Sequence, residues 1–522
     1  MFNGAASRLV AAALFFVFVL PFSLFAQSLP VFRAGTTLVD FTIVAVDERG
    51  NPVTDLRKDE LSILEDGAVR ELAFFRFEGA TGGSVPNSAV APLSSGNFSN
   101  RTAYAPDAPH HLVAVVLDFV NASLVEQFEL RAQFLQYLRQ IPADARVGLY
   151  VVRDNAVAVH DFTQDAGSVR ARLENGELDV YGRALAGIDL QKILAEARPE
   201  QRSSLAALAQ ANTRGVQEFN LQIARERRQK TLSALDSVGG HLAGLSGRKS
   251  LVWVSQGFPL TSQLEASFVD EVRDASRRLA SQGVVVYPVD AGGLKVDREN
   301  PISRGRIEAT SEVMASITGG RTARNSNELT RGLAAAGQDL RGTYAVGFYA
   351  STGLDNQWHP LTVRVSRPGV VVRHREGYYA ASTPHNLIQA WSEGRWNELA
   401  NRPLISTAVR IDARPALASG TLQLVLNVAS DDLQFRQRAS GVTADVDIAL
   451  VEKGAQGPMN LRVQSASVER PQGGGSPDVT FRTGLTLNLQ TGSVRIIVRD
   501  KSTDRFGSLD IPIAAVHSQW KE

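Results

Sequence analysis

Apolar and polar residues alternate along the first part of the chain with the period of two that half-buried strands show. The alternation runs through residues 36–78 and is broken by turn sequences at 49–52 and 66–67. It predicts a small N-terminal β unit over residues 30–79. Further alternating segments within residues 355–380, joined by a Pro-Gly turn, are expected to complete this unit.

The middle of the chain has a different pattern, in which continuous apolar runs alternate with segments of helical period. Residues 80–109 precede it and are rich in Gly, Ser, Pro and Asn, so they are expected to form a linker. Such an alternation is typical of a doubly wound α/β sheet that is covered on both faces. The expected strands are 111–120, 146–152, 157–162, 250–257, 284–290 and 343–349. The first helix is expected to bury Leu124, Phe128, Ala132, Leu135 and Leu138.

These patterns predict a central α/β domain over residues 110–350, with a polar, Ala-rich insertion at about 167–214. A short helical connector is expected at residues 385–400. Alternation then returns in many short strands over residues 401–518, which predicts a C-terminal β-sandwich. The expected fold class is therefore α/β, a doubly wound domain flanked by small β domains.

Length and composition indicate several ordinary globular domains. The chain has 522 residues, of which 44% are hydrophobic and 21% charged, and single domains usually hold roughly 100–200 residues. The formal net charge of +1 gives no electrostatic argument for nucleic-acid binding. The absence of cysteine excludes disulfides, thiolate metal sites and a cysteine nucleophile.

The N-terminus has the pattern of an export signal. Arg8 precedes an apolar run that Pro21 interrupts, and the small residue Ala26 precedes a polar one. This pattern predicts a signal peptide over residues 1–26 and a periplasmic or secreted protein with no membrane span after cleavage. Leu24 is bulkier than the residue usually found shortly before a cleavage site, so an uncleaved membrane anchor is the alternative.

Polar side chains stand at the carboxyl ends of three expected strands. Asp118, Ser255 and Asp290 each end one of them. Because ligands of doubly wound sheets bind outside the carboxyl ends of the strands, these residues are the first candidates for a functional site.

Several segments in a fixed order resemble one family. They are TTLVDFTIVAVDERGNPVTDLRKDELSILEDG, HLVAVVLDFVNAS, TLSALDSVGGHLAGLSGRKSLVWVSQGF, VVVYPVDAGGL, ITGGRTARNSNELTRGL, TYAVGFY and RPGVVVRHREGYYA. Their order and spacing over residues 36–380 resemble the exported proteins of acidobacteria that are related to the von Willebrand factor type A domain (VWFA). The C-terminal SVRIIVRDKSTDRFGSLDIPI resembles the last sandwich hairpin of such proteins. The resemblance implies a type A (Rossmann-like) fold with a β unit built from segments on both sides of it, and it implies little about activity.

Metal-binding domains of this family use an Asp-x-Ser-x-Ser motif after the first strand, a Thr from a second loop and an Asp from a third. The Asp of the motif matches Asp118, whereas Val120 and Ala122 occupy the two Ser positions. Asn121 and Ser123 lie one place later and could offer oxygens to a hard cation such as Mg²⁺ only if the loop were remodelled.

The other ligand positions of the family are also altered. Ser255 stands in place of the third-loop Asp, and Thr163 is the nearest candidate for the Thr. Because the loss of anionic ligands weakens a divalent site, we favour a metal-free site in which Asp118 caps the next helix or bonds loop amides, and Ser255 bonds backbone. The alternative is Mg²⁺ at a weak, degenerate metal-ion-dependent adhesion site (MIDAS) formed by Asp118, Asn121, Ser123 and Ser255.

Catalytic motifs are weak. The segment LSGRKS at residues 245–250 ends a helix and opens a strand, which is the reverse of a phosphate-binding loop. Ser255 follows Trp253, which stands where a nucleophile elbow needs Gly. A hydrolase that used Ser255 and Asp290 would lack an identifiable general base. We therefore expect no catalytic residues and no cofactor.

The expected function is that of an exported, non-enzymatic binding or adhesion module that contacts a protein partner through its type A domain. A carboxylate of that partner would complete the coordination of a cation, if one is bound. The alternative is a metal-free structural or assembly scaffold of the cell envelope.

Overall fold

The computed structural model describes residues 38–79, 96–101, 111–122, 124–138, 146–163, 193–194, 197–245, 248–255, 265–291, 301–322, 329–351, 355, 357–380, 391–438, 441–470 and 478–517. All of them lie in one compact unit, Thr37–Glu522. The expected signal peptide at residues 1–26 is outside the described residues, as are parts of the expected linker and insertion. Within the described residues, no helix combines the length and the apolar character needed to cross a membrane.

The N-terminal β unit combines strands from distant parts of the chain. Its elements are β1 (Leu38–Asp47), the 3-10 helix η1 (Lys58–Glu60), β2 (Leu61–Glu65), β3 (Ala68–Arg70), β4 (Leu72–Phe77), β11 (Thr343–Tyr349), β12 (Trp358–Val365), β13 (Val370–Arg373) and β14 (Gly377–Tyr379). In the described part of the chain they form two antiparallel sheets, with the orders β13-β1-β11-β4 and β14-β12-β2-β3. Ile43, Ile63 and Val346 belong to the buried cluster that the two sheets share.

Strand β11 lies in this β unit and not in the central sheet, where the sequence pattern placed it. It pairs antiparallel with both β1 and β4, with Ile43 opposite Tyr344. Gly347 lies so close to Phe74 that an added Cβ would come within 2.2 Å of the ring. Because an apolar strand suits either sheet, its sequence could not decide between them. Residues 343–349 therefore do not belong to the central domain, which was expected to extend to residue 350.

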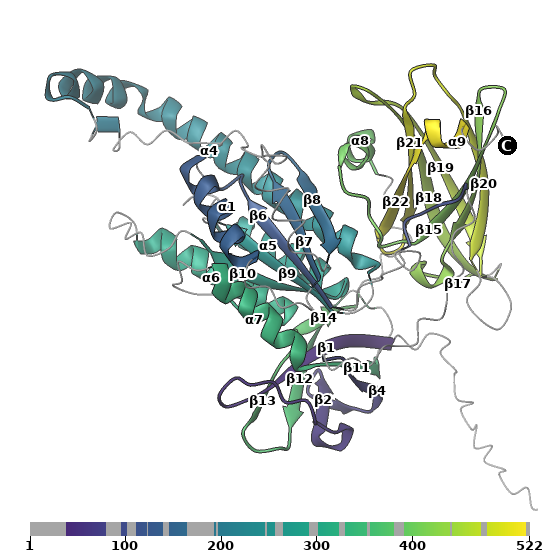
Figure 1. Cartoon of the computed structure of the whole chain (residues 1–522), viewed down its shortest axis with the longest axis horizontal. Coiled ribbons are helices and arrows are strands. Elements are labelled where there is room, and N and C mark those ends of the chain that lie inside the picture. The colour runs from purple at the N-terminus through teal and green to yellow at the C-terminus, as the bar shows by residue number, and fades with distance from the viewer. Residues whose placement is uncertain are drawn as a thin grey trace, which may run out of the picture. The chain divides into compact units, whose positions relative to one another are not determined.

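Within the described residues, the central sheet has five strands in the order β10-β9-β6-β7-β8 (Figure 1). They are β6 (His111–Asp118), β7 (Arg146–Val152), β8 (Ala156–Thr163), β9 (Arg248–Ser255) and β10 (Val284–Asp290). All neighbours pair in parallel except β7 and β8. The chain runs outward from β6 to β8 and then returns to the other side of β6, so the strand order reverses there. This is a doubly wound sheet with one antiparallel edge strand.

Helices cover both faces of the central sheet, as Figure 1 shows. They are α1 (Leu124–Leu138), α4 (Pro199–Ala243), α5 (Glu265–Ser281), α6 (Pro301–Thr318) and α7 (Leu329–Arg341). Alternate residues of β6 face opposite ways. Val113 and Val115 share a buried cluster with α1 and α7, whereas Ala114 and Val116 share one with α4, α5 and α6.

Helix α1 buries a stripe that only partly matches the expected one: among the expected residues whose side chains the structure describes, Leu135 packs against the core, but Phe128 and Ala132 are exposed. Gln127 and Phe134 are fully buried, whereas Phe128 is 54% exposed. The Gln127 amide donates hydrogen bonds to the carbonyl oxygens of Phe119 at 3.3 Å and Ala122 at 3.1 Å. Both stripes have helical spacing, and the buried one includes a polar residue that satisfies loop carbonyls. A pattern that counts only apolar residues therefore misplaces the most buried side of the helix.

The C-terminal unit consists of antiparallel strands. They are β5 (Phe98–Ser99), β15 (Ile411–Ala418), β16 (Thr421–Val428), β17 (Arg436–Arg438), β18 (Gly441–Gly454), β19 (Gly457–Glu469), β20 (Val479–Thr486), β21 (Ser493–Asp500) and β22 (Phe506–Pro512). In the described residues one sheet has the order β20-β16-β15-β5, and the other has β17-β18-β21-β22 with β19 also paired to β18. Leu424 and Ile448 lie in a buried cluster common to both sheets. The short helices α8 (Glu393–Asn401) and α9 (Ile513–His517) flank these strands in the sequence.

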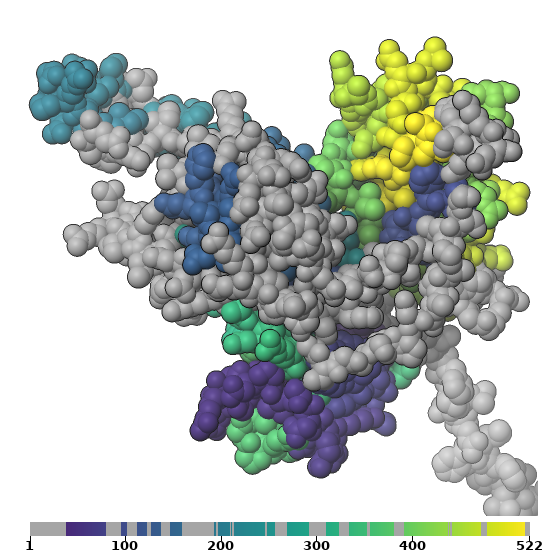
Figure 2. Space-filling model, in the orientation of Figure 1, coloured from purple at the N-terminus to yellow at the C-terminus, as the bar shows by residue number. Residues whose placement is uncertain are grey.

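Part of the expected linker is a strand of the C-terminal unit. β5 pairs antiparallel with β15, and the buried Asn100 follows it. The Asn100 amide donates to the carbonyl oxygens of Ser406 and Val409, each at 2.9 Å, and its Oδ1 accepts from the Ile411 amide at 2.6 Å. In Figure 2 the indigo atoms of residues 96–101 lie among yellow and green atoms of this unit. The chain therefore contacts the C-terminal unit before it enters the central sheet.

Buried polar side chains join the N-terminal β unit to the central sheet. Arg248 donates hydrogen bonds to the Thr42 hydroxyl at 2.6 Å and to the Tyr287 hydroxyl at 2.8 Å. Tyr287 in turn donates to Asp339 at 2.9 Å, and Asp339 forms a 2.5 Å ion pair with Arg373 of β13. Because a buried charge is costly unless it is paired and hydrogen-bonded, this network fixes how β1 and β13 meet the central sheet.

Candidate functional site

The Asp118 carboxylate lies at the end of β6 and is fully buried. Its Oδ2 accepts hydrogen bonds from the Asn121 side-chain amide at 2.7 Å and from the Ser255 hydroxyl at 3.0 Å. Its Oδ1 accepts one from the Asn121 backbone amide at 3.3 Å. Because β6 and β9 are parallel neighbours, their last residues meet at one edge. Three of the four expected site residues therefore lie around one carboxylate.

Helix α4 supplies a further residue, which the sequence analysis missed. The Asn121 amide also donates to the Thr231 hydroxyl at 2.9 Å, and Thr231 is fully buried. Thr231 precedes Leu235 and Val238 on the buried stripe of α4, so extending that stripe by one turn would have found it. The earlier candidate, Thr163, lies on β8, and its side chain is outside the described residues.

An exposed ion pair holds this part of α4 beside the strand ends. Lys230 lies 2.7 Å from Asp154, in the turn between β7 and β8, and 2.9 Å from Glu226. Burial lowers the pKa of Lys230, but hydrogen bonds to Asp154 and Glu226 outweigh it and raise that pKa above its ordinary value. The charged contacts thus stabilise the helix position that directs Thr231 inward.

The remaining expected residues do not join the described contacts of Asp118. Ser123 is outside the described residues. Asp290 ends β10 opposite Ser255 in the parallel register, and the following Ala291 amide donates to the Ser255 carbonyl oxygen at 2.9 Å. The end of β10 therefore contacts β9 through backbone.

Burial dominates the electrostatics of Asp118. It raises the pKa of this carboxyl above its ordinary value, although hydrogen bonds from Asn121 and Ser255 act in the opposite direction. The Oδ1 atom of Asn121 is buried and has no hydrogen-bond partner among the residues that the structure describes. The cluster is therefore a buried polar network in which side-chain donors stabilise one carboxyl group.

These residues do not fit a divalent cation in this arrangement. Within the described residues, no group of three or more His, Cys, Asp or Glu side chains is placed to share a metal ion. Both Asp118 oxygens face hydrogens from Asn121 or Ser255, whereas Mg²⁺ and Ca²⁺ need oxygens that are directed at the ion. A carboxyl whose pKa is raised by burial is also a poorer ligand, because a cation binds its deprotonated form.

Solved structures of low sequence identity resemble part of the chain, whereas no protein-family model and no curated protein matches it. An aerotolerance-related membrane protein from Bacteroides fragilis, carrying multiple mutations to serine, has 14% identity and a TM-score of 0.24, over 44% of this chain and 98% of that one. The conserved hypothetical protein BatB from Bacteroides thetaiotaomicron has 13% identity and a TM-score of 0.24, over 44% and 96%. The SpRpn10 VWA domain has 10% identity and a TM-score of 0.22, over 43% and 94%. These scores are too low to carry an argument by themselves.

The topology and the position of Asp118 are more informative. The sequence resemblance implied a doubly wound sheet whose first strand ends at this aspartate, and β6 ends there in such a sheet. The central unit therefore has the doubly wound α/β fold that the resemblance implied. In this central unit the candidate site lies at the carboxyl ends of β6 and β9, where α1 and α4 contribute Gln127 and Thr231.

Proposed function

We propose that this chain is an exported, non-enzymatic binding module whose type A-like unit contacts a protein partner without a resident metal ion. The bonding of Asp118 carries the proposal. Asn121 and Ser255 donate to this carboxylate at the edge where doubly wound domains bind their ligands. The groups that a cation would use are thus bonded to one another, and they hold the strand ends in a fixed arrangement.

Burial of the same residues argues against catalysis. Asp118 is 0% exposed and Ser255 is 4% exposed, so a substrate would not reach either side chain. A serine nucleophile also needs a base positioned to take its proton near working pH. The Ser255 hydroxyl instead bonds a carboxyl group that burial has made less acidic.

A second candidate is the metal-free scaffold of the cell envelope, with partner contact through the C-terminal β-sandwich. The contacts of Asn100 favour it, because they attach the chain to the C-terminal unit ahead of the type A-like unit. Export, in either case, rests on the signal-like residues 1–26 and on the resemblance to exported VWFA-related proteins.

Calorimetry tests whether the site needs a metal. Mg²⁺, Mn²⁺ and Ca²⁺ would each be titrated into metal-stripped residues 27–522, beside Asp118→Asn as a control that keeps the side-chain shape. We expect no saturable heat, and the same melting temperature in EDTA and in Mg²⁺. Saturable binding that disappears in Asp118→Asn would contradict the metal-free proposal and favour metal-dependent adhesion.

Site-directed photo-crosslinking in the producing cells tests partner binding. One photoreactive residue would replace Asn155, which is exposed in the turn between β7 and β8, at the same edge of the central sheet as Asp118. Another would replace Arg414, which is exposed on β15. We expect a discrete adduct from position 155 that persists in EDTA. Adducts from position 414 alone would favour the scaffold, and none from either position would contradict both functions.

A further inference from the structure

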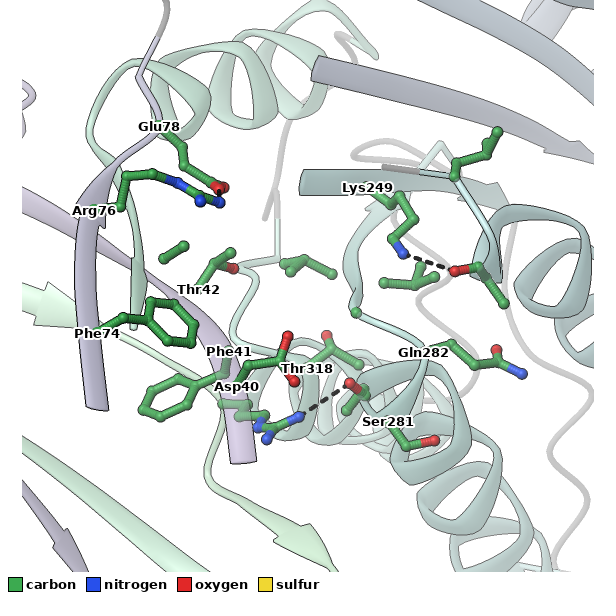
Figure 3. Close-up of a pocket in the computed structure, with 18 of the residues that line it drawn as sticks. Asp40, Phe41, Thr42, Phe74, Arg76, Glu78, Lys249, Ser281, Gln282 and Thr318 are labelled. Atoms are coloured by element: carbon green, nitrogen blue, oxygen red, sulfur yellow. Dashed lines mark hydrogen bonds and ion pairs between the residues drawn. The ribbon is translucent and has the colours of Figure 1, made fainter. Parts of the chain in front are cut away.

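A cavity of about 410 Å³ lies at the opposite edge of the central sheet from Asp118. Its lining includes Lys249, near the start of β9, together with Asp40, Phe41 and Phe74 of the N-terminal β unit. Figure 3 shows the Lys249 ammonium and the Asp40 carboxylate facing the same space, with Phe41 and Phe74 along one side. The cavity is therefore separate from the polar network at the carboxyl ends of the strands.

Two of the cations that line the cavity are almost fully buried. Lys249 is 7% exposed and Arg375 is 9% exposed. Lys249 donates a hydrogen bond of 3.1 Å to the carbonyl oxygen of Ala243, the last residue of α4, and Arg375 donates one of 3.2 Å to Ala280, near the end of α5. The Arg375 Nε is buried, and no described residue accepts a hydrogen bond from it. An ammonium has three donors and a guanidinium has five, so within the described part of the chain most of their donors are unused.

Negative charge in the cavity does not balance these cations. Among the described residues, neither cation forms an ion pair, and Asp40 is the acidic group whose charge acts on both. Glu78 is bonded at 2.5 Å to a neighbouring arginine, and Arg505 adds positive charge beside Lys249. Burial lowers the pKa of Lys249 to about 8 and that of Arg375 to about 10. Buried charges in proteins are normally paired. The excess positive charge of the cavity therefore favours the binding of an anion.

One wall of the cavity suits an apolar group. Phe41 and Phe74 lie on one side, and the Arg375 guanidinium is 5.3 Å from the centre of the Phe41 ring. Sites for small organic molecules are usually cavities of about 300–1,000 Å³ with apolar walls and a few placed polar groups. The cavity has this size, and Phe41 and Phe74 give it one aromatic wall within a lining that is otherwise mainly polar.

We propose that this cavity binds a small organic anion, with its carboxylate or phosphate group between Lys249 and Arg375 and its apolar part against Phe41 and Phe74. The oxyanion accepts charge-assisted hydrogen bonds from donors that the protein leaves unused. Asp40 opposes the ligand charge, so a singly charged head group is preferred to a highly charged one. The site is independent of the proposed partner contact at the other edge of the sheet.

Calorimetry and thermal denaturation of residues 27–522 test the proposal with two probes. Benzoate carries a carboxylate on an apolar ring, whereas inorganic phosphate lacks an apolar part, so the pair distinguishes the head group and the contribution of the aromatic wall. Lys249→Met should weaken binding about tenfold or more, because it removes a charge-assisted bond. Asp40→Asn should strengthen binding, since it removes the opposing charge. Arg364→Met, at an exposed position of β12, is the matched control and should leave binding unchanged.

Saturable binding of either probe that is weakened by Lys249→Met and strengthened by Asp40→Asn supports the site. The absence of binding of both probes at millimolar concentration overturns it, as does equal affinity in the native chain and in Lys249→Met. Lys249→Met is expected to fold, because it replaces a buried charge with an apolar side chain of similar length. Its circular dichroism spectrum checks this directly.

Discussion

The Ser255 hydroxyl donates a 3.0 Å hydrogen bond to the Asp118 carboxylate, and both side chains are buried. The two residues are the last of β9 and β6, which lie side by side in parallel. The bond thus connects the carboxyl ends of two core strands across 137 residues of sequence. A buried acceptor that loses a donor suffers a desolvation penalty without compensation, so this bond should be measurable in stability.

Ser255→Ala should lower the free energy of unfolding by about 1–3 kcal/mol, because it leaves a buried carboxylate with one donor fewer. Ser62→Ala, at an exposed position of β2, is the control and should change stability by no more than about 0.5 kcal/mol. Urea denaturation followed by tryptophan fluorescence measures both. Equal effects of the two substitutions would show that the Ser255 bond contributes nothing.

Asp118→Asn should remove a pH dependence of stability. Burial raises the pKa of Asp118 above 3.8, so the folded chain binds this proton more tightly than the unfolded chain. The native protein should therefore lose stability relative to Asp118→Asn as pH rises above about 4 and through the folded pKa. Denaturation at a series of pH values measures the difference. A native chain that gains stability over this range would indicate a lowered pKa, as a bound cation would cause.

Asn100→Ala should destabilise the C-terminal unit by about 2–4 kcal/mol, because it leaves two buried carbonyls and one amide without partners. Asn97→Ala changes the same segment at a half-exposed position and should be nearly neutral. The fluorescence of Trp391 and Trp396, whose rings pack 4.8 Å apart, reports the unfolding of this unit. If Asn100→Ala left the free energy of unfolding unchanged, residues 96–101 would not be bound to the C-terminal unit in solution.

Lys249→Met should be more stable than the native chain at neutral pH. Burial lowers the pKa of Lys249 from 10.5 to about 8, so the folded chain holds this proton less tightly than the unfolded chain. The penalty, at most about 3 kcal/mol, is present below about pH 8, and the native chain recovers stability as pH rises toward 10.5.

The advantage of Lys249→Met should therefore decrease over the same window. Lys58→Met, at an exposed position, should show neither effect. Thermal denaturation between about pH 7 and 10 measures the trend. An advantage that is constant with pH would contradict the assignment of the penalty to buried charge.

The meeting of Asp118 and Ser255 could be predicted because parallel apolar strands end at one edge, and each strand shows its end where apolar residues give way to polar ones. Thr231 could not be placed as easily. It is 110 residues from Asn121, on a helix, and its role depends on the rotation of α4 against the sheet. Local sequence identifies a buried stripe, whereas packing decides which atoms it touches.

The same limit applies to strand partners. TYAVGFY was correctly predicted as a strand, but its apolar residues fit the central sheet and the N-terminal β unit equally well. Residues 96–101 have the composition of a linker. Asn100 is nevertheless buried, and its side chain is hydrogen-bonded to backbone groups more than 300 residues away in the sequence. Strand identity is local, whereas pairing depends on neighbours that are distant in sequence.

The N-terminal β unit is assembled from segments that are far apart in the sequence, which has a consequence for biosynthesis. The Leu56 amide donates to the Tyr344 hydroxyl across 288 residues of sequence, and the last strand of the unit ends at Tyr379. A ribosome therefore makes β1 to β4 first. Strands β2 and β3 can pair at once, but β11, β12 and β13, which pair with β1, β2 and β4, are made only after the whole central sheet. Non-local pairing is slow, and open strand edges promote aggregation. The edges of β1 and β4, which wait longest for their partners, are thus the part of the nascent chain most exposed to wrong pairing.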